Sequence, residues 1–213
     1  MALTTTAGAS AEGRSTRTML RRGSWGKADI AIVDHLGQPA ILKDFSGKAW
    51  PVRLLGHLQI RREIRALARL ADVEGIPRCL GTTGPHALLM ERIEGEWITH
   101  WCRKRPDGVV PMFERLACLV DAMHARGVAH ADLRKRDNIL VDPAGRPAVI
   151  DFNASFCFAP RGLGARILFP LLRAVDRGAI LKWKTRLAPA LTTPAERRRD
   201  RIMTLLRRLW IFN

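Results

Sequence analysis

The residues best suited to chemistry lie between positions 130 and 153 of the chain. His130, Asp132 and Asn138 occupy one short polar stretch, and Asp151 directly follows an apolar run. A carboxylate such as that of Asp132 can accept or orient the proton of an attacking hydroxyl group. The side-chain oxygens of Asn138 and Asp151 are ligands that the hard cation Mg²⁺ prefers. Residues of these types can serve proton transfer or bind a hard cation, but a single His-x-Asp sequence specifies neither.

Four features upstream complete an ordered set. Gly23 and Gly26 flank a short turn, Lys43 lies in a β-rich run, Glu63 lies in a helical pattern, and an apolar run ends at Glu91. None of these features is specific alone, because short glycine turns and single His-x-Asp sequences arise by chance. Only the order of all these features along the chain is specific enough to indicate a protein family.

The ordered set resembles the protein-kinase-like superfamily, whose catalytic loop and metal motif appear here as H-x-D-L…N-I-L and I-D-F. The resemblance covers roughly residues 20–155. It implies an α+β, two-lobed protein-kinase-like fold, in which a small antiparallel β-sheet N-lobe with one helix precedes a short, mostly helical C-lobe. It also implies that the protein uses ATP and Mg²⁺.

The same resemblance implies a role for each matched residue. Asp132 would orient the acceptor hydroxyl, while Lys43 would bind the α- and β-phosphates, held by an ion pair with Glu63. Arg134 stands where protein kinases usually carry a lysine near the transferred phosphate, and it keeps the positive charge. The implied catalytic residues are Asp132, Lys43, Glu63, Arg134 and Asn138; the nucleotide-binding residues are Gly23, Gly26, Lys43, Met90, Glu91 and Ile93; the metal ligands are Asn138 and Asp151.

The catalytic loop and the metal motif depart from the kinase pattern in two places. Asn138 lies six residues after Asp132 rather than five, which leaves Asp137 as an alternative metal ligand. The distance back from Asp151 favours Asn138. Asn153 replaces the glycine of Asp-Phe-Gly, and asparagine is among the residues that best tolerate a positive φ.

The segment after Asp151 is short for a protein kinase. No Ala-Pro-Glu motif follows, so the usual activation segment and peptide-docking helices do not all fit. In this respect the chain resembles compact kinases, namely the lipopolysaccharide core-sugar (Kdo/WaaP) kinases and the RIO-type atypical kinases. The resemblance implies phosphotransfer to a glycolipid sugar hydroxyl or else to a protein Ser/Thr. A nucleotide-binding pseudokinase or scaffold and a basic nucleic-acid-binding protein are the alternatives.

Composition and periodicity divide the chain into three parts. Residues 1–18 are rich in Ser, Thr, Ala and Gly and predict a flexible tail, 19–93 an N-lobe with its hinge, and 94–213 a C-lobe with basic C-terminal helices. Apolar periodicity and turn residues predict strands at 30–33, 40–45 and 87–90, and helices at 53–70 and 111–127. A capping box at Thr193 and Glu196 predicts a further helix.

The composition is that of a basic globular protein. The 213 residues are 47% hydrophobic, and 36 Lys and Arg against 20 Asp and Glu give a formal net charge of +16. These values exclude a disordered tail protein, a collagen-like fibre and a small disulfide scaffold. No apolar stretch approaches the length of a membrane span. Four scattered cysteines predict neither a disulfide nor a metal site, and Cys118 is expected in the core, so we expect a cytoplasmic protein.

Residues 151–213 carry 13 basic and 4 acidic side chains, and three interpretations of this segment remain open. The first interpretation is a solvated surface. The second is a contact for an anionic acceptor or for the inner face of the cytoplasmic membrane, and the third is a nucleic-acid contact. The last is least favoured, because the sequence has neither a groove-reading motif nor an aromatic platform. The apolar stripe at Ile167, Leu168, Leu171, Leu172 and Val175 predicts packing in the lobe core, with membrane contact as the alternative.

Overall fold

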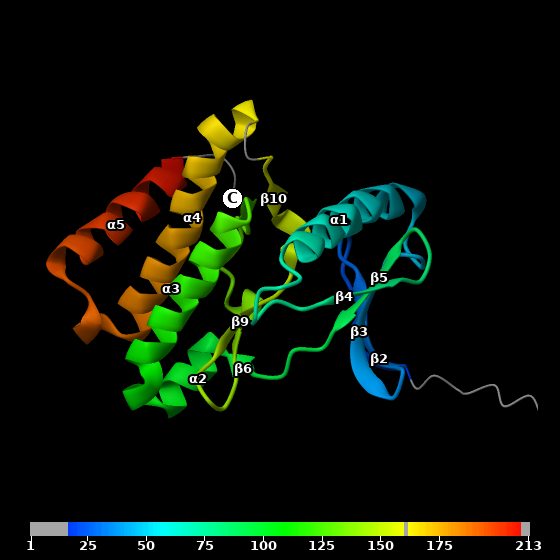
Figure 1. Ribbon diagram of the computed structural model, residues 1–213, viewed down its shortest axis with the longest axis horizontal. Coiled ribbons are helices and arrows are strands. Elements are labelled where there is room, and N and C mark those ends of the chain that lie inside the picture. Colours follow the sequence, from blue (N-terminus) through cyan, green and yellow to red (C-terminus); the bar gives the residue numbers. More distant parts are fainter. Residues whose placement is uncertain (1–16, 160–161, 210–213) are drawn as a thin grey trace, which may run out of the picture.

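The computed structural model describes residues 17–159 and 162–209, with an antiparallel sheet in the N-terminal part and helices in the C-terminal part (Figure 1). The predicted α+β class is therefore confirmed. All neighbouring strands of the five-stranded sheet are antiparallel. Their order is β1 (Thr18–Arg21), β2 (Asp29–His35), β3 (Gln38–Asp44), β5 (Ala87–Glu91) and β4 (Cys79–Thr82).

The central hairpin of the sheet joins β2 to β3 through a two-residue turn. Both turn residues have a positive φ, 53° at Leu36 and 78° at Gly37, which suits the twist of a tight hairpin. Alternate residues of the two strands, including Val33, Ala40 and Leu42, form a small apolar cluster. The predicted strands at 30–33, 40–45 and 87–90 are thus present, and Lys43 falls on β3.

Helix α1 (Trp50–Arg69) follows β3, as its periodicity predicts. It packs through a face that includes Val52, Gly56, Ile60 and Leu67. Gly56 is required there, because a Cβ at this position would lie 2.4 Å from the Phe45 ring. The apolar side chains at positions 54, 55 and 58 lie outside this face and are exposed.

The helical part contains four α-helices and short pieces of β-structure. The helices are α2 (Ile98–Lys104), α3 (Val109–Ala125), α4 (Leu163–Leu187) and α5 (Pro194–Leu209). One small sheet has the order β6 (Glu96–Trp97), β8 (Ile139–Val141), β9 (Pro147–Val149), and another pairs β7 (Val128–Ala129) with β10 (Phe156–Cys157). The 3₁₀ turns are η1 (Pro106–Gly108), η2 (Arg136–Asn138), η3 (Phe152–Ala154) and η4 (Pro189–Leu191).

Two of the predicted helices are present with the expected details. The α3 residues Phe113, Leu116, Val120 and Met123 are all buried, and Gly127 beyond the helix has a φ of 71°. At the start of α5 the capping box is reciprocal. The backbone N–H of Thr193 donates to Glu196 Oε2 at 2.8 Å, and that of Glu196 donates to Thr193 Oγ1 at 3.1 Å.

Two expectations about burial are wrong. Ile167, Leu168 and Leu171 of the α4 stripe are exposed rather than packed in the core, because the buried face of α4 is formed further along, at Ala179 and Trp183. Cys118 is exposed as well. The tail at 1–16 and the side chains of the predicted apolar face at Leu205, Leu206, Leu209 and Phe212 lie outside the described residues.

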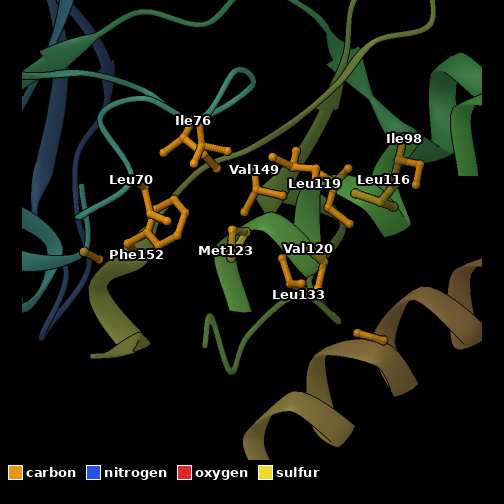
Figure 2. Packing of buried hydrophobic residues seen from close by; sticks show 14 of the residues in the cluster. Leu70, Ile76, Ile98, Leu116, Leu119, Val120, Met123, Leu133, Val149 and Phe152 are labelled. Carbon is orange, nitrogen blue, oxygen red and sulfur yellow. The ribbon is translucent and has the colours of Figure 1, made fainter. Parts of the chain in front are cut away.

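One continuous apolar core joins the sheet, α1 and the helical part. In Figure 2, Leu70 after α1 and Phe152 after Asp151 converge with Met123 of α3 and Val149 of β9. This packing lets residues from distant segments meet with little freedom. No helix in the described ranges is both long enough and apolar enough to cross a bilayer.

Candidate active site

A buried ion-pair triad joins the sheet, α1 and the loop after β9. The ammonium of Lys43 on β3 donates to Glu63 Oε1 at 2.6 Å and to Asp151 Oδ1 at 2.8 Å. Glu63 is fully enclosed, and Lys43 retains about a tenth of its side-chain exposure. Three residues that are up to 108 positions apart therefore meet, in the pairing that the kinase resemblance implies.

The charges of the triad are set by burial and by each other. Burial lowers the pKa of Lys43, but the charges of Glu63 and Asp151 outweigh it and raise that pKa above its usual value. Burial raises the pKa of Asp151, yet the Lys43 charge and hydrogen bond bring it below its usual value. Burial holds the pKa of Glu63 above its usual value in spite of Lys43. Lys43 and Asp151 are consequently charged at neutral pH.

Glu63 also fixes the metal motif, because its Oε1 accepts the backbone N–H of Phe152 at 3.2 Å. The Phe152 ring is completely buried, and its carbonyl accepts the Ser155 hydroxyl at 2.7 Å. Asp151 itself has a φ of 69°, an uncommon conformation for a residue with a side chain. The surrounding bonds maintain this strained conformation and aim the carboxylate at Lys43.

The catalytic loop places Asn138 beside Asp132. The Asn138 side-chain NH₂ donates to the Asp132 backbone carbonyl at 2.9 Å and lies 3.4 Å from its carboxylate. The backbone carbonyl of Asn138 accepts the backbone N–H of Ile150 at 3.0 Å, which brings the loop next to Asp151. Asn138 is buried, whereas Asp137 is half exposed and pairs with Arg136. The geometry thus favours Asn138 over Asp137 as a metal ligand.

The ammonium of Lys135 contacts the Asp132 carboxylate. The Lys135 Nζ lies 2.5 Å from Asp132 Oδ2. The kinase resemblance implies Arg134 as the loop cation, and Lys135 is a second basic residue of the same loop.

The backbone of the catalytic loop is held by side chains from α4, which sequence reasoning missed. The buried carboxylate of Asp176 accepts the N–H of His130 at 2.9 Å and that of Ala131 at 2.8 Å. Further along α4, Lys182 donates to the Arg134 carbonyl and Trp183 to the Leu133 carbonyl, at 2.8 and 2.9 Å. The signal that points to Asp176 is that it is the one acid of α4, a helix otherwise made of apolar, small and basic residues.

His130 supports the loop from inside the core. Its Nε2 lies 3.0 Å from the Ile150 carbonyl, and its Nδ1 faces the Asp132 N–H at 3.3 Å. Burial lowers the pKa of His130, although the Asp176 charge opposes the shift. The imidazole is therefore neutral at pH 7 and donates from Nε2 to the Ile150 carbonyl, so its role in the loop is structural.

The glycine turn lies between β1 and β2 and is tied to the approach to α1. The Gly23 N–H donates to Asp29 Oδ1 at 2.8 Å, and Lys48 bridges Asp29 and the Gly23 carbonyl. A Cβ at Gly23 would lie 2.2 Å from the Lys27 carbonyl oxygen, and Gly26 has a φ of 78°. The close backbone contact at Gly23 and the positive φ at Gly26 therefore already account for glycine at both positions.

The connector after β5 is the segment where the kinase resemblance implies contacts with a nucleotide base. Met90 is buried, and Glu91 is occupied, with its N–H bonded to the Arg78 carbonyl at 2.9 Å and its carboxylate to the Arg78 side chain. In the part of the chain that the structure describes, residues 92–94 make no backbone hydrogen bonds. The backbone of Ile93 is therefore open to a ligand, whereas the Glu91 N–H is already used.

The side chains at the implied Mg²⁺ site offer oxygen donors. Asp151 offers a carboxylate whose side chain is 30% exposed. The side-chain NH₂ of Asn138 donates to Asp132, so the side-chain oxygen of Asn138 is available for a ligand. No cluster of three His, Cys, Asp or Glu side chains suited to a metal occurs among the described residues. This set fits Mg²⁺, which is typically held by one or two carboxylates together with substrate phosphates.

Solved structures with similar folds are kinases. The Rio2 kinase from Chaetomium thermophilum aligns with a TM-score of 0.60 at 17% identity, over 88% of this chain and 63% of that one. Its ADP/Mg²⁺-phosphoaspartate complex aligns with a TM-score of 0.59 at 18% identity, over 84% of this chain and 58% of that one. At this identity the likeness defines the fold.

Curated relatives include plant serine/threonine kinases. The CBL-interacting serine/threonine-protein kinase 16 of Arabidopsis thaliana is 34% identical over 116 residues, covering 51% of this chain and 24% of its own length. The CBL-interacting protein kinase 32 of Oryza sativa subsp. japonica is 30% identical over 142 residues, covering 62% and 31%. The chain spans only about a quarter to a third of these relatives.

The fold and the arrangement of the site define a protein of the protein-kinase-like superfamily. Within it, the model of the lipopolysaccharide kinase (Kdo/WaaP) family matches residues 20–156, which is more than half of the chain. The chain belongs to this family. The matched range contains every predicted site residue, whereas α4 lies beyond it.

Proposed function

We propose that the protein is an ATP- and Mg²⁺-dependent phosphotransferase that phosphorylates a hydroxyl group, with a glycolipid sugar as the acceptor. The main support is the contact of Lys43 with both Glu63 and Asp151. It joins a phosphate-binding cation to a metal-binding carboxylate in the order and pairing of kinases.

In the proposed reaction the acceptor oxygen attacks the γ-phosphorus of ATP, and the bond between this phosphorus and the β–γ bridging oxygen breaks. The products are a phosphorylated acceptor and ADP. The Asp132 carboxylate accepts the hydroxyl proton and later releases it to solvent. Lys43 binds the α- and β-phosphates, and Lys135 adds a positive charge beside Asp132.

The residues that would hold Mg²⁺ are Asn138 and Asp151, and the ion would neutralise phosphate charge as the bond to the leaving group breaks. Glu63 accepts hydrogen bonds from both Lys43 and the Phe152 backbone and so fixes their relative positions. Asp176 and Trp183 hold the loop backbone, so Asp132 does not need to reorganise during the reaction.

A sugar acceptor is favoured over a protein Ser/Thr for two reasons. The family model that matches the chain is named for lipopolysaccharide kinases. In addition, the chain lacks an Ala-Pro-Glu motif after Asp151, and with it the usual peptide-docking elements. The matches to plant serine/threonine kinases cover about a quarter to a third of those proteins and keep a protein acceptor as the competing outcome.

The test is phosphate transfer from radiolabelled ATP by the full chain, with and without Mg²⁺, to a Kdo-bearing lipid A precursor and to a generic Ser/Thr protein substrate. We expect Mg²⁺-dependent labelling of the lipid, lost by at least 100-fold in Asp132→Asn. A Glu114→Gln variant, altered in a surface carboxylate on α3, serves as the matched control. Equal labelling by wild type and Asp132→Asn would disprove the proposal.

A pseudokinase would give a different result in the same samples. It would show a nucleotide-dependent rise in melting temperature without any labelled acceptor and without ATP hydrolysis. Labelling of the protein substrate alone would replace the sugar acceptor by a Ser/Thr acceptor and leave the assignment of Asp132 unchanged.

A further inference from the structure

Exposed apolar side chains gather along one edge of the molecule. Eight of the seventeen large apolar side chains that are exposed among the described residues lie on α1, β10 and the first turns of α4. They are Trp50, Leu54, Leu55, Leu58, Phe156, Ile167, Leu168 and Leu171. Leu54 is 57% exposed, Leu58 50% and Ile167 69%. Clusters of this kind on a protein surface mark sites of interaction.

The same edge carries arginines and no exposed acid. On α1, Arg61 and Arg65 continue the face of Leu54 and Leu58, because the four residues are spaced by four, three and four positions. Glu63 is the only acid of α1, and it is buried in the active site. Residues 152–159 and 162–175 contain no acid at all. Among the described residues, no carboxylate lies within ion-pair distance of Arg61 or Arg65.

Aromatic and arginine contacts join the three elements into one rigid surface. The Arg62 guanidinium of α1 lies 5.8 Å above the Phe156 ring of β10. Arg69 at the end of α1 donates to the Phe158 carbonyl at 2.7 Å, and the Phe158 ring packs on Phe169 of α4 at 4.9 Å. In Figure 1, α1, β10 and the first turns of α4 together form the upper edge of the molecule.

We propose that this edge is a docking surface for an anionic lipid bilayer. Helices that carry leucines and a tryptophan next to arginines bind in the plane of a membrane interface, with the apolar residues inserted and the cations beside lipid phosphates. Protein partners more often occupy a groove or extend a sheet. Here the apolar residues lie on the outer faces of helices and alternate with cations, which matches a planar, negatively charged surface.

This inference concerns binding and does not require phosphotransfer. It rests on the proposed function only in one respect, namely that docking would bring a glycolipid acceptor to the protein. None of the residues that form the docking surface belongs to the active site. The two share only helix α1, which carries Glu63 on its opposite, buried face. Loss of docking and loss of catalysis are therefore separable by mutation.

The experiment is flotation of the full chain with vesicles of phosphatidylcholine containing 30% phosphatidylglycerol, and with vesicles of phosphatidylcholine alone. We expect binding to the anionic vesicles that weakens as salt is added, and little binding to the neutral ones. The double variant Arg61→Gln/Arg65→Gln should reduce the partition coefficient about 25-fold, about fivefold for each charge removed. Leu54→Ser/Leu58→Ser should reduce it about tenfold or more at every salt concentration.

Two control variants make the test specific. Arg198→Gln/Arg201→Gln on α5 removes two exposed arginines of the basic C-terminal segment, and Leu36→Ser removes a leucine that is 90% exposed at a hairpin. Both should bind like the wild type, and all four proteins should keep their melting temperatures. Nucleotide-induced thermal shifts should persist in the α1 variants.

Three results would overturn the proposal. The first is unchanged binding in both α1 variants. The second is a loss of binding that follows the α5 variant instead, which would assign the membrane contact to the C-terminal segment. The third is equal binding to neutral and anionic vesicles, or to neither. A protein that fails to phosphorylate any acceptor but binds anionic vesicles through α1 would disprove the proposed function and leave the docking surface in place.

Discussion

The carboxylate of Asp176 on α4 lies 2.9 Å from the backbone nitrogen of His130, 46 positions earlier in the chain. The oxygen in this contact, Oδ2, also lies 3.0 Å from His124 Nε2, and the other oxygen, Oδ1, accepts the N–H of Ala131. Ala131 has a φ of 64°, so the bond to Asp176 stabilises an otherwise unfavourable backbone conformation at the residue before Asp132. A fully buried acid on one helix thus determines the shape of the catalytic loop.

Replacement of Asp176 by Ala should therefore impair both folding and activity. It leaves two buried N–H groups without acceptors, and we expect the free energy of unfolding to fall by about 3 kcal/mol. Urea denaturation measures this loss. In the fraction that remains folded, kcat should fall more than the affinity for nucleotide, because Asp132 moves while Lys43 does not. Asp121→Ala, which alters an exposed acid on α3, should change neither property strongly.

Replacement of Lys43 by Met should abolish the nucleotide-dependent thermal shift and destabilise the fold. The variant leaves Glu63 and Asp151 near each other without their shared cation, which typically costs about 3 kcal/mol at neutral pH. Without Lys43 the pKa of both carboxylates rises, so the folded state takes up protons as the pH falls. The difference from wild type should therefore be smaller at pH 5 than at pH 7 in urea denaturation. A constant difference would contradict the triad.

Protonation of His130 should make the fold sensitive to mild acid. Burial lowers its pKa in the folded state below 6.5, so over this range the unfolded chain binds more protons than the folded one. The free energy of unfolding should consequently decline as the pH falls through 6.5. His130→Asn should show a smaller decline between pH 7 and pH 5. The exposed His100 offers the control, because His100→Asn should keep the wild-type slope.

Replacement of Lys135 by Ala should lower kcat about tenfold or more while leaving the melting temperature unchanged. Lys135 is largely exposed, so it contributes little to folding, but its ammonium contacts the Asp132 carboxylate. Arg136→Ala removes a neighbouring exposed cation and should retain near wild-type activity. If Arg136→Ala lowers kcat as much as Lys135→Ala does, general loop charge rather than the Asp132 contact accounts for the effect.

Much of the fold follows from local patterns in the sequence. The hairpin of β2 and β3, the strand β5 and the buried face of α3 are encoded in runs of a few residues whose periodicity is unambiguous. The ordered set from Lys43 to Asp151 also predicts which residues come together, since its members keep the order of a known superfamily.

The parts that could not be predicted depend on distant contacts. The apolar residues of α1 indicate a helix, but only the position of the sheet decides that Ile60 is buried and Leu58 exposed. Asp176 becomes meaningful only when α4 lies against the loop at His130. Lys135 has no counterpart in the kinase pattern, and its contact with Asp132 is seen only in the folded loop.

The contribution of α4 sets the smallest unit that can work. A fragment that ends at residue 156, where the match to the family ends, would retain all the residues proposed to bind nucleotide and metal and to accept the proton. It would nevertheless lack Asp176, Lys182 and Trp183, which bind the loop backbone at four of the five positions from 130 to 134. Truncation experiments and domain transplants with this chain should accordingly retain the sequence through residue 187, the end of the helix.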